Sequence, residues 1–167
     1  VARTESKLQA LAEKLRAEHG ITVTVIPCDL TAPDAAERLW EETNRAELEI
    51  DVLVNNAGFG TSGDVADESP KRLEQEVRLN CLTLTGLTAR YLPAMRERKN
   101  GTIINIASTA AFQPLPHMAV YGATKAFVLS FTEALWSETR KDGIRVLAVC
   151  PGPTDTSFLD RKSTRLN

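Results

Sequence analysis

The sequence predicts an α/β fold built on a doubly wound parallel sheet. Short apolar and β-branched runs alternate with amphipathic helical segments along the chain, and the connections between them are short. This alternation favours parallel strands joined by right-handed helical crossovers. Several of the apolar runs end in small or amide residues. Because open parallel sheets bind ligands at the carboxyl ends of their strands, the same pattern predicts where a site lies.

The chain opens with the end of a strand, a helix and a second strand. We interpret residues 1–3 as the last residues of a strand and Thr4 as the cap of the helix that follows. Gly20 is expected to end this helix, because glycine readily adopts the left-handed conformation found at helix C-termini. The run over residues 21–26 predicts a strand. The buried face of the helix is expected to carry Leu8, Leu11, Ala12 and Leu15.

Two helices around a strand are predicted for the middle of the chain. A helix is expected over residues 33–47, a strand over 51–55 and a glycine-rich loop over 58–63. Ser69 and Pro70 then start another helix, as a capping residue followed by proline in the first turn. The inward positions of the first helix are Ala36, Leu39, Trp40 and Thr43, and the second carries Val77, Leu79, Asn80, Leu84 and Leu87 before Pro93.

The remaining elements are two strands around a long helix. Strands are expected over 102–106 and 145–150, and the helix begins near Met118. The periodic pattern stops after Phe158, so we expect one domain over residues 1–158 and a polar, disordered tail over residues 159–167.

Composition restricts the class of protein. The 167 residues are 43% hydrophobic and 25% charged, with a net charge of -2, which is typical of a folded domain and argues against nucleic-acid binding. No apolar run reaches membrane-spanning length, so we expect a soluble, cytoplasmic protein without a membrane partner. Cys28, Cys81 and Cys150 lie in or beside apolar segments and are interpreted as core thiols, with no metal site expected.

Tyr121 and Lys125 are the residues most suited to chemistry. They lie four apart on the last predicted helix, so they share one face of it. A lysine ammonium about 4 Å from a phenolate stabilises it by roughly 4 kcal/mol at an effective dielectric constant of about 20. Ser108, at the end of the preceding strand, could bind the same substrate oxygen. An isolated Tyr-x-x-x-Lys pair is, however, more often structural than catalytic.

Further motifs favour a catalytic role for this pair over a structural one. Asn55-Asn56-Ala57-Gly58, Asn80, Ser108, Tyr121, Lys125 and Pro151-Gly152 stand in the order and spacing of the short-chain dehydrogenase/reductase family, which residues 1–158 resemble. The resemblance implies a Rossmann-like domain that exchanges hydride between NADP(H) and a carbonyl or alcohol substrate. It makes Tyr121 the general acid or base, with Lys125 stabilising its phenolate and binding the nicotinamide ribose. Ser108 positions the carbonyl oxygen, and the backbone at Asn80 holds a water in a proton route.

The resemblance also implies a set of cofactor contacts. Asp29 would meet the adenine ring, although its alternative role is to form a turn. Arg3 follows Ala2 where NAD-binding members have an acid, so NADP is expected over NAD. A guanidinium suits a 2′-phosphate, and the alternative is a surface arginine at a helix start. The other expected contacts are Asn55, Ala57, Gly58, Tyr121, Lys125, Pro151, Gly152, Thr154 and Thr156.

The family pattern is incomplete at both ends of the chain. The first strand and its glycine-rich turn have no counterpart, which leaves the strand at Val52 with an exposed edge. We therefore expect marginal stability, or a rearrangement that brings residues 21–26 beside residues 51–55. The complete protein is expected to be a homodimer or homotetramer, paired through the helices that bear Asn80 and Tyr121. The alternative functions are a non-catalytic fragment or a nucleotide-binding regulator with the same fold.

Overall fold

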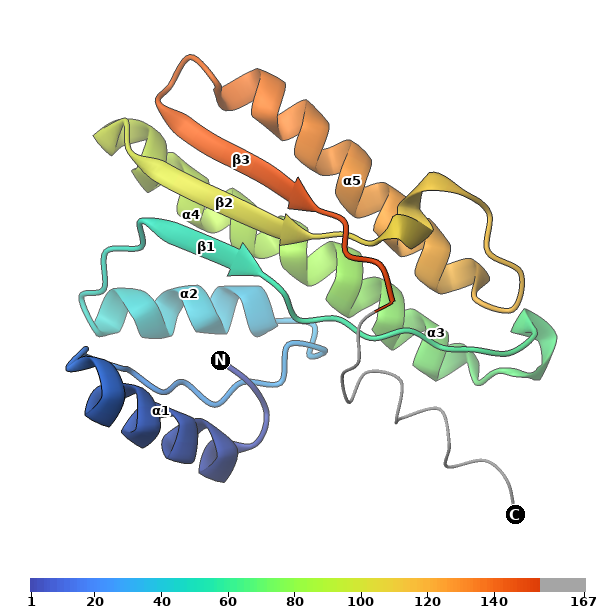
Figure 1. The fold of residues 1–167 in the computed structure, drawn as a ribbon, viewed down its shortest axis with the longest axis horizontal. Coiled ribbons are helices and arrows are strands. Elements are labelled where there is room, and N and C mark those ends of the chain that lie inside the picture. The colour runs from blue at the N-terminus through green and yellow to red at the C-terminus, as the bar shows by residue number, and fades with distance from the viewer. Residues whose placement is uncertain (154–167) are drawn as a thin grey trace.

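The computed structural model describes residues 1–153 and confirms the predicted parallel α/β architecture (Figure 1). Within these residues, three parallel strands form a sheet in the order β1-β2-β3. The register pairs Val54 with Ile104 and Ile104 with Leu147. The elements are α1 (Glu5–His19), α2 (Ala35–Arg45), β1 (Val52–Asn55), η1 (Val65–Asp67), α3 (Pro70–Val77), η2 (Arg78–Thr83), α4 (Leu84–Arg98), β2 (Gly101–Ile106), η3 (Thr109–Phe112), α5 (Ala119–Thr139) and β3 (Ile144–Val149).

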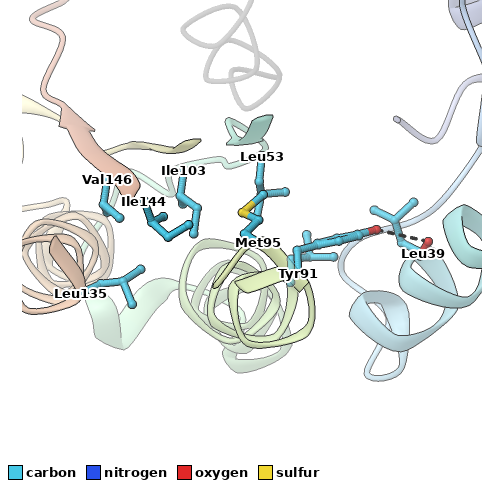
Figure 2. Packing of buried hydrophobic residues seen from close by; sticks show 9 residues of the cluster. Leu39, Leu53, Tyr91, Met95, Ile103, Leu135, Ile144 and Val146 are labelled. Atoms are coloured by element: carbon cyan, nitrogen blue, oxygen red, sulfur yellow. Dashed lines mark hydrogen bonds between the residues drawn. The ribbon is translucent and has the colours of Figure 1, made fainter. Parts of the chain in front are cut away.

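The main core lies between one face of this sheet and helices α4 and α5. Figure 2 shows Leu53, Ile103 and Val146 of the strands facing Met95 of α4 and Leu135 of α5. Side chains alternate along the strands, so every second residue enters this core. Ile103 and Met95 are fully buried, which places the centre of the core between β2 and α4.

The opposite face of the sheet is far more exposed. Val52 and Val54 of β1 are 54% and 52% exposed, and Leu147 and Val149 of β3 are 48% and 44% exposed. Within the described residues β1 pairs on one side only, with β2, so the expected exposed edge at Val52 is confirmed. Sheets of parallel strands are ordinarily covered on both faces.

The prediction of a strand over residues 21–26 is wrong. The segment is extended, but parallel pairing in this region is limited to a single bridge between Ala2 and Pro27, where the Cys28 amide donates to the Ala2 carbonyl at 2.9 Å. A strand requires a partner for its backbone groups, and the Val23 carbonyl instead accepts from the Arg16 guanidinium. The segment does not pair with β1, so the rearrangement, one of the two expected alternatives, is not observed, and marginal stability stays a prediction.

The long helical run after Ser69 differs from the prediction in two ways. It contains a π-helical segment, η2, between α3 and α4, and it continues through Pro93 to Arg98. Proline in a helix interior costs roughly 3 kcal/mol, and the burial of Tyr91 and Met95 on either side of it offsets that cost.

Helix faces and ends were predicted with mixed success. Leu39 and Thr43 are buried as expected, whereas Trp40 is 37% exposed and Leu11 is 52% exposed. Val77 is likewise exposed. Gly20 ends α1 in the left-handed conformation, as predicted, while Thr4 and Ser69 occupy N-cap positions without a side-chain capping hydrogen bond.

We predict that Leu87→Ala, in the main core, lowers the free energy of unfolding by about 2–5 kcal/mol, because it leaves a cavity beside α4. The matched control is Leu11→Ala on exposed α1, which should change it by less than about 0.5 kcal/mol. Urea unfolding of the two variants measures the difference, and equal losses would contradict the burial of Leu87.

Candidate active site

Helix α5 brings Tyr121 and Lys125 together as the sequence predicts. The Lys125 Nζ atom lies 5.8 Å from the centroid of the Tyr121 ring. The same atom donates a hydrogen bond of 2.7 Å to the carbonyl of Ile106, the last residue of β2. The lysine side chain is therefore fixed between the sheet and its own helix, with its ammonium beside the tyrosine ring.

Burial and the neighbouring groups act in opposite directions on the Lys125 amine. Only 6% of the residue is exposed, and this burial lowers the pKa of its amine, while Cys81, Cys150 and Glu76 act in the opposite direction. Thiols and a carboxyl around an amine favour its charged form when they ionise. The Lys125 cation in turn lowers the pKa of the Cys81 thiol. Burial has the larger effect on this thiol and raises its pKa to about 11.

Ser108 lies where β2 ends, before η3. Its Oγ atom accepts from the Ala110 amide at 3.1 Å, and the residue is 8% exposed. The next residue, Thr109, donates its amide to the Pro151 carbonyl at 3.1 Å, and Ala107 donates to Val149. The segment after β3 thus runs beside Ser108, so the carboxyl ends of β2 and β3 meet at one place.

Asn80 occupies the π-helical segment η2 and is almost completely buried. Its Nδ2 donates to the Phe59 carbonyl at 2.9 Å and to Thr124 Oγ1 at 3.0 Å, and its Oδ1 accepts from the Phe59 amide at 3.2 Å. Asparagine is unfavourable inside a helix, and these hydrogen bonds compensate for that cost. Asn80 therefore ties the loop after β1 to α5.

Two glycines allow that loop to approach the other residues. A Cβ at Gly58 would lie 3.0 Å from Asn80 Oδ1 and 3.7 Å from Lys125 Nζ. A Cβ at Gly60 would lie 2.9 Å from Tyr121 Cδ2, closer than real Cβ atoms come to other atoms. The backbone of the loop consequently forms a wall against Tyr121 that a larger residue would push away.

The Asn55 side chain is directed away from this wall. Its Nδ2 donates to Asn105 Oδ1 at 2.9 Å and to Thr88 Oγ1 at 3.2 Å, and Asn105 in turn donates to Thr132. Because the side chain is engaged in the interior, the predicted cofactor contact at Asn55 would have to be made by its main-chain atoms. Asn105 was not predicted as a site residue, although an amide within the apolar run 102–106 is a signal of a buried polar network.

The residues predicted for the adenosine end lie together in a separate groove. Arg3, Asp29 and Arg38 line a cavity of about 570 Å³. Asp29 accepts from the amide and hydroxyl of Thr31 at 3.0 and 2.8 Å, which lowers the pKa of its carboxyl, with smaller contributions from the two arginines. The turn-forming role considered for Asp29 is thus observed.

A further contact, which was not predicted from the sequence, lies at the surface before α5. His117, at positive φ before the helix, places its Nδ1 2.7 Å from Asp64 Oδ1, and its carbonyl accepts from the Gly63 amide at 2.8 Å. These contacts join the segment before α5 to the loop after β1.

Comparison with known proteins supports one family for this site. The family model for short chain dehydrogenases matches residues 1–167. The chain belongs to the short chain dehydrogenase family. Its relatives include the very-long-chain 3-oxoacyl-CoA reductase of Macaca fascicularis, 32% identical over 90% of this chain and 49% of that protein. The 17-beta-hydroxysteroid dehydrogenase type 3 of Mus musculus is 32% identical over 99% of this chain and 55% of that protein. The chain thus spans about half the length of these curated relatives.

Solved structures of short chain dehydrogenases have the same fold. The enzyme from Sphingobium yanoikuyae, in complex with NADPH, has a TM-score of 0.90 and 37% identity, with 95% of this chain and 62% of that one covered. L-sorbose reductase from Gluconobacter frateurii, complexed with NADPH and L-sorbose, has a TM-score of 0.83 and 31% identity, with 90% and 57% covered.

The remaining predicted site residues are either exposed at the ends of the strands or lie outside the described residues. Ala57 is exposed at the end of β1, and Pro151 and Gly152 are exposed after β3, at the edge where the site lies. Thr154, Thr156 and the tail 159–167 lie outside the described residues.

Within residues 1–153, the three cysteines are free, no cluster of metal-ligating side chains occurs, and no helix is long and apolar enough to span a membrane.

We predict that Gly60→Ala lowers dehydrogenase turnover of the full-length protein by about tenfold or more, since the new methyl group displaces the Tyr121 ring. Gly86→Ala is the control, because its Cβ would meet Ala36 at the same 2.9 Å between α2 and α4. Steady-state turnover should be retained in the control while its thermal stability falls. Normal turnover in Gly60→Ala would contradict the close packing against Tyr121.

Proposed function

We propose that the Tyr121 site belongs to an NADP(H)-dependent oxidoreductase that transfers a hydride between the nicotinamide and a carbonyl or alcohol group of a small-molecule substrate. The observation that carries the proposal is the position of the buried Lys125 ammonium. It donates to the Ile106 carbonyl, and its Nζ atom lies 5.8 Å from the centroid of the Tyr121 ring. Family membership and the NADPH complexes of two structural neighbours support it.

Tyr121 acts as the general acid in reduction and as the general base in oxidation. Its hydroxyl gives a proton to the carbonyl oxygen in one direction and takes it back in the other. A lysine cation about 4–6 Å from a phenolate oxygen stabilises it by roughly 3–4 kcal/mol at an effective dielectric constant of about 20. Fixing the lysine on the main chain of β2 maintains this interaction throughout the reaction.

Ser108 and Asn80 assist Tyr121 in different ways. The Ser108 oxygen accepts from the Ala110 amide, and its hydroxyl hydrogen is suited to donate to the substrate oxygen. The Asn80 side chain is fully used in holding Phe59 and Thr124. Its part in a water-linked proton route therefore falls to the main chain of the π-helical segment, whose carbonyls do not follow the α-helical pairing.

The described residues fit a nicotinamide dinucleotide. Of the three N–H donors of Lys125, one binds Ile106, which leaves two for ribose hydroxyls. Arg3 presents a planar guanidinium in the groove with Asp29, suited to a 2′-phosphate. When bound, NADP(H) supplies or accepts the hydride. The full set proposed to hold it is Arg3, Asp29, Asn55, Ala57, Gly58, Tyr121, Lys125, Pro151, Gly152, Thr154 and Thr156.

The proposal extends to the organisation of the whole protein. We assign residues 1–158 to the NAD(P)-binding domain and residues 159–167 to a polar tail. The complete protein would be a cytoplasmic homodimer or homotetramer.

Tyr121→Phe should abolish turnover in the full-length protein and leave NADPH binding within about threefold of the parent, because only the proton donor is lost. Tyr91→Phe is the matched control, since that hydroxyl serves a structural bond of 2.8 Å to Thr43 and should leave turnover intact. Turnover and NADPH fluorescence titration are the measurements.

The same experiment separates the two alternative functions. A nucleotide-binding regulator would bind NADPH in the parent and in both variants without any turnover. A non-catalytic fragment would show neither binding nor turnover when the 167-residue chain is titrated. Turnover retained by Tyr121→Phe would remove that residue from the mechanism.

Arg3→Asp should raise the Michaelis constant for NADPH far more than that for NADH, by about tenfold or more, because the new carboxylate repels a 2′-phosphate. Lys7→Asp, an equal charge change at an exposed position of α1, serves as the control. Steady-state kinetics with both cofactors distinguish the cases, and equal effects of Arg3→Asp on the two would refute selection by this residue.

A further inference from the structure

His117 occupies a turn position at which glycine is favoured. The Met118 amide donates to the Leu115 carbonyl at 3.1 Å, which closes a β-turn with Pro116 second and His117 third. The φ angle of His117 is 60°, in the left-handed region. A turn with proline second and a positive φ third takes glycine most easily, because a Cβ there crowds the backbone. His117 therefore carries a conformational cost that glycine would avoid.

The side chain of His117 makes a contact that glycine could not make. Its Nδ1 atom lies 2.7 Å from the Oδ1 atom of Asp64. Because a carboxylate only accepts, Nδ1 is the donor of this hydrogen bond. The carbonyl of His117 accepts from the Gly63 amide at 2.8 Å. His117 thus binds two successive residues of the loop after β1, one through its side chain and one through its main chain.

These contacts lie beside the first turn of α5. Figure 1 shows the loop after β1 and the segment before α5 side by side, beyond the carboxyl ends of the strands. A Cβ at Gly60 would lie 3.3 Å from Met118 Cε and 2.9 Å from Tyr121 Cδ2. The loop is therefore joined to the segment at His117, and its backbone lies against the helix again at Met118 and Tyr121.

The His117 contact is better suited to placing its neighbours than to stabilising the fold. The side chains of His117 and Asp64 are 71% and 62% exposed, and pairs this exposed contribute little to overall stability. Position is the more sensitive property, since a displacement of about 1 Å in a reacting group can lower a rate by about a hundredfold. Left-handed non-glycine residues are also concentrated at functional sites.

We propose that His117 is a positioning residue for Tyr121, and that its contact with Asp64 holds the loop after β1 against the tyrosine ring. The effect on turnover rests on the proposed function of Tyr121, whereas the effect on the loop does not. Substitution by glycine is informative here, because His117→Gly relieves the turn and removes the side-chain contact.

Hydrogen exchange of the peptide covering residues 58–64 tests the effect on the loop in the full-length protein. Protection of this peptide should fall by about threefold to tenfold in His117→Gly and in Asp64→Ala, while thermal unfolding stays near that of the parent. The double variant should lose no more protection than either single variant, because both remove one contact. His19→Ala and Asp67→Ala change the same residue types at other exposed positions and should behave like the parent.

Turnover tests the effect on Tyr121. His117→Gly should lower kcat by about threefold to tenfold and change the Michaelis constant for NADPH less, because Tyr121 is displaced while the cofactor contacts remain. Asp64→Asn keeps an acceptor oxygen and should recover most of the kcat that Asp64→Ala loses. The Asp64 variants remain decisive if His117→Gly does not fold.

Three results would overturn the positioning role. They are parent-like protection in His117→Gly and Asp64→Ala, additive losses in the double variant, and a parent-like kcat despite lost protection. A parent without any turnover, together with the expected losses of protection, supports the contact with the loop and instead overturns the proposed function.

Discussion

The hydrogen bond from Lys125 to the Ile106 carbonyl is the contact on which the site depends. It joins the middle strand of the sheet to α5 at the point where β2 ends, with a donor–acceptor distance of 2.7 Å. A buried cation with a charge-assisted bond is oriented far more strictly than an exposed one, because no water can replace its partner. The same bond therefore links α5 to the sheet and holds the ammonium beside the ring of Tyr121, so that fold and chemistry share one contact.

Around this bond, polar side chains occupy the carboxyl-end half of an otherwise apolar core. Asn55, Asn105 and Thr132 form one chain of hydrogen bonds, and Asn80 with Thr124 forms another. Groups of this kind are costly when unsatisfied, so mutual pairing is what allows them to lie in the interior. The sheet is accordingly divided: Ile103, Ile144 and Val146 stabilise the fold at the amino end of the strands, and the amide networks stabilise the loops that carry the site.

The parts of this arrangement that follow from local pattern were predictable from the sequence. Alternating runs gave β1, β2 and β3, and the four-residue spacing gave the shared helix face of Tyr121 and Lys125. Features that depend on neighbours were not. Residues 21–26 have the composition of a strand but find almost no partner for their backbone, and Trp40 has the spacing of a core residue but no layer to cover it. The π-helical segment at Asn80 likewise occurs together with bonds from Asn80 to Phe59 and Thr124, which lie far apart in the sequence.

Glu76 shows why a buried carboxyl group is the hardest of these features to predict. Its sequence context, in a helix rich in charged residues, is typical of a solvated face, and the exposed Glu74 beside it follows that pattern. What distinguishes Glu76 is the packing of α3 against α5 and the loop after β1, which removes water from one face of a short helix. Burial is the largest influence on both groups: it raises the pKa of the Glu76 carboxyl and lowers the pKa of the Lys125 amine. An acid with a raised pKa and an amine with a lowered pKa are thus two consequences of the same exclusion of water from the space between α3, α5 and the sheet.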